Sequence, residues 1–271
     1  MDNTYLKQQG NNQPLYPDML WSKPEQKSSA GKLAIIGGSE RGFNTVSQAY
    51  ARVSSAGAGA IRVLFPSALR RTLAKIWPES EFAPSSKSGE FAASALSEWL
   101  DLDQWSDSVL LPGDLGKSSE TAILLERYLS RSPSIITLSG DSINILIDTP
   151  APILENERVT LAVSTAQLQS LLVSIRYPMS VRLDNTLFQL AGLLHSLTLN
   201  YPWCVTTIHQ SLIYVSYQGE VSVTPLTTGL SLTDVAAYSA VWRMQQPAKS
   251  FMGITSGIYE LAAQKSNNSK L

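Results

Sequence analysis

The chain has 271 residues, of which 44% are hydrophobic and 16% charged, and its formal net charge is −1. This composition is typical of a globular protein, and because Lys and Arg do not cluster, neither a nucleic-acid surface nor a polybasic membrane patch is expected. Cys204 is the only cysteine, which excludes an intrachain disulfide and a thiolate metal site. With no charged n-region followed by an apolar h-region, and no apolar run long enough for a bilayer, we expect a cytoplasmic protein.

Residues 1–30 are polar, with scattered Pro, Gly and Ser, and predict an N-terminal arm. From there to residue 197, apolar runs alternate with helical patterns. The expected strands are 33–36, 60–65, 108–111, 134–138 and 159–163, and the expected helices are 44–56, 66–76, 90–100, 118–130, 165–172 and 184–197. Residues 77–89 read as a loop, and 141–147 are ambiguous. The alternation predicts a mostly parallel, doubly wound α/β sheet.

The pattern changes after residue 200. Three segments rich in β-branched residues, 203–208, 212–216 and 220–224, are expected to form a small antiparallel meander, with a hairpin turn at Gln218 and Gly219. Two helices, 232–244 and 249–263, follow. We therefore expect one α/β domain over residues 31–264 and a polar tail over 265–271.

Two glycine-rich segments follow expected strands. The segment GGSERG at 37–42 lacks the third-position glycine of a dinucleotide fingerprint, so it is either a tight turn or a backbone cradle for a ligand. The segment LPGDLGKS at 111–118 has Leu111 where a P-loop requires its first glycine. We favour a glycine turn lining a ligand crevice at the carboxyl edge of the sheet.

Two aspartates, Asp141 and Asp234, are candidates for a functional carboxylate. Asp141 follows an expected strand. It either binds a substrate hydroxyl or a magnesium-bound water, or it is an N-cap or turn aspartate with no functional role. Thr233 and Asp234 open the helix expected at 232–244. Asp234 is either a capping residue or a catalytic carboxylate held at a helix N-terminus.

The order of these segments resembles the ADP/ATP-dependent NAD(P)H-hydrate dehydratases of the ribokinase-like superfamily, over about residues 20–263. The stretches WSKPEQKSSAGKLAIIGGS (21–39) and VSSAGAGAIRVLFP (53–66) are similar to the family's first strand and to the turn before its second. Of the family's Gly-Pro-Gly-Leu-Gly loop, LPGDLG keeps Gly113, Leu115 and Gly116; SGDSI keeps Asp141 of the next motif, and SLTDV keeps Asp234.

The resemblance implies a ribokinase-like fold, ADP or ATP with Mg²⁺ as cofactors, and NADH or NADPH hydrate as the substrate. The nucleotide would phosphorylate the hydrate's hydroxyl, elimination of phosphate would restore the nicotinamide, and Asp234 would be the catalytic base. A homo-oligomer is also implied. The family pattern places the remaining site residues as follows: substrate-binding Gly38, Ser39, Thr45, Gly113, Gly116, Asp141 and Ser164, and nucleotide-binding Thr207, Gln210, Ser211 and Thr233.

The chain departs from the family at three motifs. Ser164 and Gln167 stand where the family has a histidine and a glutamate, and TIHQS at 207–211 lacks the lysine and glycines of the nucleotide loop. Ser231 and Thr233 replace glycines before Asp234. Glycines permit the positive φ and close backbone approach of a phosphate loop, which Gln210 should resist. Two alternatives therefore stay open: a ribokinase-like binding or structural protein with a decayed nucleotide site, and a carbohydrate-type small-molecule kinase of the same superfamily.

Overall fold

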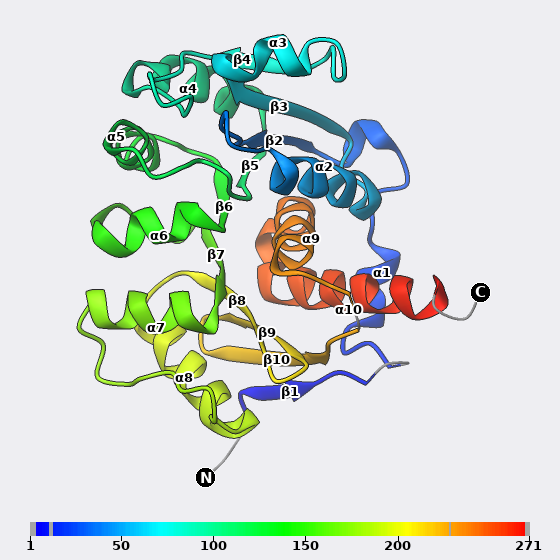
Figure 1. Ribbon diagram of the computed structural model, residues 1–271. Helices are drawn as coiled ribbons and strands as arrows, with labels where there is room; N and C mark the ends of the chain where they lie inside the picture. Colours follow the sequence, from blue (N-terminus) through cyan, green and yellow to red (C-terminus); the bar gives the residue numbers. More distant parts are fainter. Residues whose placement is uncertain (1–3, 11–12, 228, 269–271) are drawn as a thin grey trace.

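The computed structural model describes residues 4–10, 13–227 and 229–268, the last four of these by their backbone (Figure 1). Within these described residues, ten strands form one sheet in the order β1-β10-β9-β8-β7-β6-β5-β2-β3-β4. The strands are β1 Leu6–Gln8, β2 Lys32–Ile36, β3 Ala60–Pro66, β4 Glu81–Ala83, β5 Ser108–Leu111, β6 Ile135–Ser139, β7 Val159–Ser164, β8 Cys204–His209, β9 Leu212–Tyr217 and β10 Glu220–Pro225.

The sheet is parallel from β4 to β8 and turns antiparallel at β9 and β10. Parallel strands joined through helices all end at one edge, and this carboxyl edge is where ligands bind in open α/β sheets. The predicted fold class, a mostly parallel doubly wound sheet with a late antiparallel meander, is confirmed.

Helices cover both faces of the sheet (Figure 1). The helices α4 to α8 lie on one face, whereas α2, α9 and α10 lie on the other. The helices are α1 Pro17–Trp21, α2 Asn44–Ala56, α3 Arg70–Leu73, α4 Leu96–Trp105, α5 Ser119–Leu129, α6 Asp141–Asp148, α7 Thr165–Ser174, α8 Leu187–Asn200, α9 Leu232–Gln245 and α10 Ser250–Asn268. No helix in the described part of the chain has the length and hydropathy of a membrane-spanning segment.

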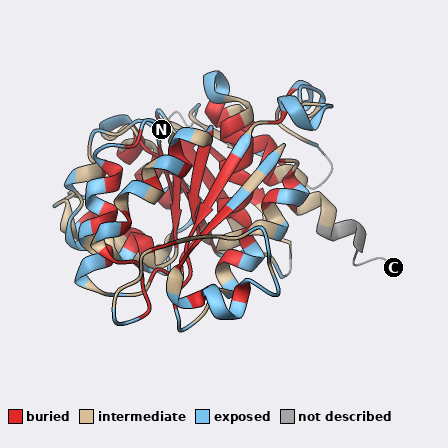
Figure 2. Ribbon diagram, turned by 90° about the horizontal axis from the view of Figure 1, so that it is seen from above, coloured by how far each residue is buried: buried red, intermediate tan, exposed pale blue. Residues whose placement is uncertain are grey.

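The core is split into two layers by the sheet, whose central strands are buried (Figure 2). Trp99, Tyr128 and Trp203 fill the layer under α4–α8, and Tyr238 and Trp242 fill the other. Helix α9 is buried on every side from Asp234 to Met244 because it lies between the sheet, α2 and α10. Its N-terminus is therefore held in a fixed place at the carboxyl edge.

Several predicted elements need correction. The polar segment before residue 30 contributes β1, which pairs with β10, and α1. Residues 77–89 contain the short edge strand β4, and the helix expected at 90–100 lies at Leu96–Trp105. Only Arg70–Leu73 of the stretch expected to be helical at 66–76 is α-helix, preceded by one 3-10 turn. Thr186, rather than Asp184, caps α8 through a capping box.

Candidate functional site

Two glycine loops meet at the carboxyl edges of the neighbouring strands β2 and β5. Gly37 lies so close to the β5 loop that a Cβ there would stand 2.7 Å from the carbonyl oxygen of Gly113. Gly38 has φ +90°, and a Cβ on it would lie 2.8 Å from the Phe65 ring. Gly113 has φ +131°. The sequence placed these glycines in one crevice; the structure brings them into contact, and tight packing already accounts for two of them.

Asp141, the first residue of α6, anchors the β5 loop. Its Oδ1 accepts the N–H of Leu115 at 3.2 Å, and its Oδ2 accepts the N–H of Gly116 at 2.9 Å. Burial raises the pKa of Asp141, Asp114 adds to the rise, and the two backbone donors oppose it. The backbone amides that the sequence assigned to a ligand are thus already bonded to a carboxylate of the chain.

Asp114 and Glu90 likewise accept backbone N–H groups, at the N-termini of α2 and α5. Asp114 has φ +61°, and its Oδ2 accepts the N–H of Thr45 at 2.8 Å, within the first turn of α2. Glu90 accepts the N–H of Ser118, the N-cap residue of α5, at 2.7 Å. Burial alone would raise the pKa of Glu90, but the hydrogen bonds from Ser118 and Lys117 and the charge of Arg41 together outweigh it, and the pKa is lowered. Both carboxylates occupy places where an external anion would be favoured.

Ser164 has a capping role at the end of β7. Its Oγ accepts the N–H of Gln167 at 3.1 Å, and Gln167 Oε1 accepts the N–H of Ser164 at 3.1 Å, which together form a capping box. Gln167 Nε2 also donates to the carbonyl oxygen of Gly140 at 2.7 Å. The residues that replace the family's histidine and glutamate therefore join β7 to the β6 loop.

Asp234 is buried, with 1% of its side chain exposed, at the first turn of α9. Oδ1 accepts Arg52 Nε at 2.6 Å and Gln48 Nε2 at 3.1 Å, both from α2. Oδ2 accepts the N–H of Ser231 at 2.7 Å and its Oγ at 3.1 Å. Ser231 Oγ in turn accepts the N–H of Asp234, so Asp234 takes the place of the glutamate in a capping box. The two oxygens accept bonds from four donors.

These donors determine the acidity of Asp234. Burial alone would raise its pKa, but the bonds from Ser231, Gln48 and Arg52 outweigh it, and the pKa lies below its ordinary value of 3.8. A general base needs an accessible lone pair and a pKa near the working pH. In this arrangement Asp234 offers neither.

The predicted nucleotide-binding residues lie on the meander and on α9. Gln210 (φ +46°) and Ser211 (φ +62°) form the two-residue turn between β8 and β9, so the expectation that Gln210 resists positive φ is wrong. Paired left-handed residues are what a tight hairpin turn requires, and the strand register imposes them on non-glycine residues. Thr207 is buried within β8 and Thr233 is the second residue of α9. None of the four lines the cavity described next.

A cavity of about 540 Å³ opens at the carboxyl edge between α5 and α6. Two predicted substrate-binding residues, Gly116 and Asp141, line it. The other lining residues are Lys117, Ser118, Ser119, Ala122, Asn144, Ile145, Asp148 and Thr149. The wall therefore combines one cation, hydroxyl groups, an amide and two carboxylates.

The side chains present at this edge do not fit the Mg²⁺ ion and the nucleotide that the resemblance implied. Among the described residues, no group of three or more His, Cys, Asp or Glu side chains is placed to hold a metal ion. Asp141 and Asp234 are bonded to the chain's own donors, and the β8–β9 turn carries neither a lysine nor a glycine for a phosphate.

Comparison with solved structures places this architecture among ribokinase-like proteins. A ribokinase-like superfamily protein from Enterococcus faecalis V583 matches 98% of this chain and 89% of its own with a TM-score of 0.72 at 15% identity. A hypothetical protein from Streptococcus mutans matches 93% of this chain and 89% of its own, with a TM-score of 0.70 at 14% identity. The fold is therefore ribokinase-like.

An enzyme of known activity is also among the structural neighbours. ADP/ATP-dependent NAD(P)H-hydrate dehydratase from Bacillus subtilis, co-crystallised with ATP and Mg²⁺, matches 88% of this chain and 81% of its own with a TM-score of 0.61 at 10% identity. No protein-family model matches the chain, and no curated protein sequence matches it. The structural matches establish the fold, but at identities this low the activity has to be argued from the residues of this chain.

Sequence reasoning missed the residues that occupy this edge. Asp114 was visible inside LPGDLG, between two glycines that were singled out. Gln48 and Arg52 stand four residues apart on α2, a spacing that places them on one helix face, but nothing in the sequence indicates that this face meets Asp234. Glu90 is identified only by its contact with Ser118, 28 residues away in the chain.

Proposed function

We propose that this chain is a ribokinase-like binding protein that holds a small hydroxylated metabolite in the cavity between α5 and α6 and does not transfer phosphate. The occupied carboxylate of Asp234 carries the proposal. Its four donors leave no oxygen for a substrate hydroxyl, and its lowered pKa opposes proton uptake.

The cavity supports the ligand class. Its volume of about 540 Å³ lies within the range of small-molecule sites. Asp148 presents a carboxylate acceptor and Asn144 a side-chain amide, and Lys117 with two serine hydroxyls presents donors. Hydroxyl groups both donate and accept hydrogen bonds, so a polyol can bond to the donors and to the acceptors of the cavity at once. Two carboxylates beside a single lysine disfavour a polyphosphate, because like charges repel in a partly dehydrated site.

A second candidate function is the ADP- or ATP-dependent dehydration of NADH or NADPH hydrate. One observation favours it: the capping box bonds the N–H of Asp234 and leaves the N–H groups of Leu232 and Thr233, ahead of it on α9, outside the box. They point out of a helix N-terminus, where an anion is favoured. Under this function Arg52 and Gln48 must release Oδ1 before Asp234 can accept the hydroxyl proton. A small-molecule kinase of this fold makes the same demand.

One assay tests both functions. The protein, the Asp234→Asn variant and the Arg52→Ala variant are incubated with NADH hydrate, Mg²⁺ and either ADP or ATP, and absorbance is followed at 340 nm. Binding without transfer predicts no recovery in any of the three. Nucleotide-dependent recovery of absorbance that disappears in Asp234→Asn would overturn the proposal and support the dehydratase. Faster recovery in Arg52→Ala would then show that the bond between Arg52 and Asp234 limits the rate of the reaction.

Ligand binding is tested directly by thermal melting with pentoses, hexoses and nucleosides. A ligand that binds only the native state raises the melting temperature by mass action. We expect a shift with one of these classes that is lost in Lys117→Ala and Asp148→Ala. Asp18→Ala, on α1 and away from the cavity, is the matched control. Shifts with ADP or ATP but with no sugar or nucleoside would contradict the polyol assignment.

A further inference from the structure

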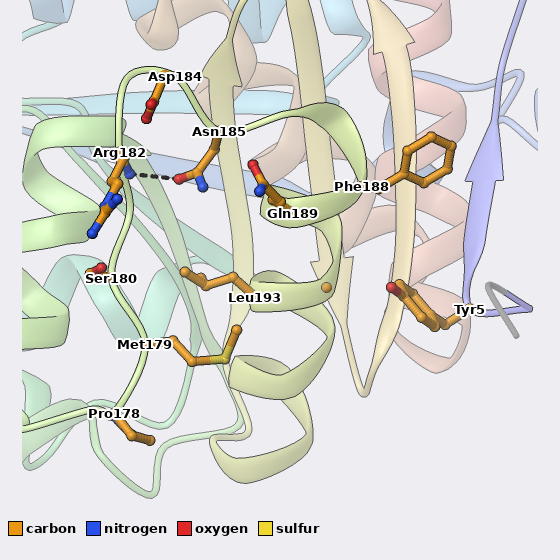
Figure 3. A pocket seen from close by; sticks show the side chains of 11 residues that line it. Tyr5, Pro178, Met179, Ser180, Arg182, Asp184, Asn185, Phe188, Gln189 and Leu193 are labelled. Atoms are coloured by element: carbon orange, nitrogen blue, oxygen red, sulfur yellow. Dashed lines mark hydrogen bonds between the residues drawn. The ribbon is translucent and has the colours of Figure 1, made fainter. Parts of the chain in front are cut away.

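Two hollows of the described surface differ in the charge of their walls. The larger, of about 950 Å³, lies beside α8 and is shown in Figure 3. Its two charged lining residues, Arg182 and Asp184, have opposite signs and cancel. The cavity between α5 and α6 is lined by Lys117, Asp141 and Asp148, so its wall carries one more negative than positive group. This second wall can therefore select among hydroxylated ligands by their charge.

Asp148 is the carboxylate of this wall that is available to a ligand. Both oxygens of Asp141 already accept backbone N–H groups, whereas the side chain of Asp148 has no hydrogen bond or ion pair with a described residue. Asp148 is the last residue of α6, and the last turn of this helix contains no basic residue. The carbonyl groups at a helix C-terminus carry partial negative charge, which disfavours a carboxylate and favours a cation. A cationic ligand group would therefore stabilise this position.

Asn144, which lines the same cavity one turn before Asp148, has an amide of fixed orientation. Its Oδ1 accepts Gln167 Nε2 at 3.0 Å. The same nitrogen of Gln167 donates to the carbonyl oxygen of Gly140 at 2.7 Å, and Gln167 Oε1 accepts the N–H of Ser164 at 3.1 Å. Gln167 is thus held at both ends of its own amide. Because Oδ1 of Asn144 is engaged, its Nδ2 is the group left for a ligand, and it can only donate.

These two residues of α6 place different requirements on a ligand side by side. Residues four apart on a helix share one face, and their Cβ atoms lie about 6 Å from each other. Asn144 requires an acceptor, and Asp148 is best satisfied by a donor that carries positive charge. A polyol with an ammonium group next to an oxygen supplies both on neighbouring carbon atoms. A neutral polyol supplies the acceptor but leaves the charge of Asp148 uncompensated.

The rest of the lining favours a ring-shaped polyol over other cationic ligands. Ala122 and Ile145 give the wall an apolar patch on which the C–H face of a sugar ring can pack. Ser119 and Thr149 add side-chain hydroxyls that can bond to the hydroxyls of the ring. An amino acid also carries an ammonium group, but its carboxylate would add a third negative group to a wall with one cation.

We infer that the ligand of the cavity between α5 and α6 is a cationic polyol of the amino-sugar class. Its ammonium group is bound by Asp148, and the neighbouring oxygen accepts a hydrogen bond from Asn144 Nδ2. The inference rests on the proposed function, which assigns a hydroxylated metabolite to this cavity. It adds the charge of that metabolite and the two residues that select it.

Isothermal titration calorimetry of the full chain at pH 6 tests the inference with matched probes. Glucosamine is protonated at this pH, glucose has a hydroxyl in place of the amine, and N-acetylglucosamine has an uncharged amide there. Ethylammonium carries the charge without the hydroxyl groups. We expect glucosamine to bind at least about tenfold more tightly than each of the others, because a hydrogen bond to a charged group is worth that ratio. Equal affinities of glucosamine and glucose would overturn the inference and leave the proposed function standing.

Two variants should move the ratio of glucosamine to glucose affinity in opposite directions, which a loss of folding cannot do. Asp148→Asn keeps an acceptor oxygen and removes the charge, so the ratio should fall to about one. Asn144→Asp keeps the acceptor for Gln167 and adds a charge, so the ratio should rise. Asp18→Asn, on α1, is the matched control and should leave it unchanged.

Three further outcomes would count against the inference. A ratio unaffected by Asp148→Asn would overturn it, and so would ethylammonium binding as tightly as glucosamine, since the site would then recognise a bare cation. If no polyol binds, charged or neutral, the proposed function fails together with the inference.

Discussion

Polar groups at the carboxyl edge of the sheet are hydrogen-bonded within the chain, whereas two charged side chains on the loop beside α8 have no ion pair with a described residue. At the carboxyl edge, Asp114, Asp141 and Asp234 accept the backbone donors that a ribokinase-like fold could offer to a ligand. On the loop 178–185 beside α8, in contrast, the exposed side chains of Arg182 and Asp184 form no ion pair with a described residue. The comparison teaches that backbone donors exposed by a fold can be satisfied by carboxylates of the same chain, so recognition at that edge must depend on other groups of the cavity wall.

The largest effect is expected from crowding the edge at Gly116. Its φ is +88°, and a Cβ would lie 2.1 Å from Glu90 Cδ. Gly116→Val should therefore lower the free energy of unfolding by about 3 kcal/mol or more, through backbone strain and displacement of Glu90. Urea unfolding measures the change. Gly42→Ala, where a Cβ meets nothing within 4 Å, is the control and should have a much smaller effect.

Removing the carboxylate of Asp234 should have the next largest effect. Asp234→Ala removes the capping box and leaves Arg52 without its partner, so we expect a loss of about 3 kcal/mol at pH 7. An equal loss in Ser231→Ala would attribute the whole effect to the cap, whereas a smaller loss there assigns the remainder to the pair with Arg52. No loss in Asp234→Ala would contradict the internal role of this residue.

The same carboxylate predicts a pH dependence. The pKa of Asp234 is lowered in the folded state from an ordinary value of 3.8. Its stabilising contribution is therefore present above pH 3.8 and is lost as the pH falls through the lower folded pKa. The difference in unfolding free energy between the unchanged chain and Asp234→Asn should shrink as the pH is lowered from 6 toward 3. A difference that stays constant over this range would show that the ionised form is not preferred by the fold.

Much of the fold was predictable because it depends on local patterns. Apolar runs gave β2 and β5–β7, Asn44–Ala56 was predicted to the residue as α2, and the turn at Gln218 and Gly219 was correct. The edge elements β1 and β4 were missed because three-residue strands take their conformation from a neighbouring strand rather than from their own sequence. The domain boundaries and the roles of the site residues stay predictions.

The candidate site was predictable only in position. Gly38, Gly113, Gly116 and Asp141 do meet at one edge, because strand order places the carboxyl ends of β2, β5 and β6 side by side. What occupies that edge was not predictable, because the Asp234–Arg52 contact joins residues 182 positions apart. A glycine-rich loop in a sequence looks the same whether its amides face a ligand or a carboxylate of the same chain.

The smallest effect is expected at Gly192, in the middle of α8. Among the described residues, a methyl group added there meets the Tyr5 hydroxyl at 3.4 Å, which is ordinary contact. Gly192→Ala should therefore stabilise the chain by about 0.5–1 kcal/mol through helix propensity. Urea unfolding measures the change, and a loss of stability would show that contacts within the chain require this glycine. At Gly116, in contrast, the added atom clashes with Glu90, so adding a side chain there should destabilise the same protein.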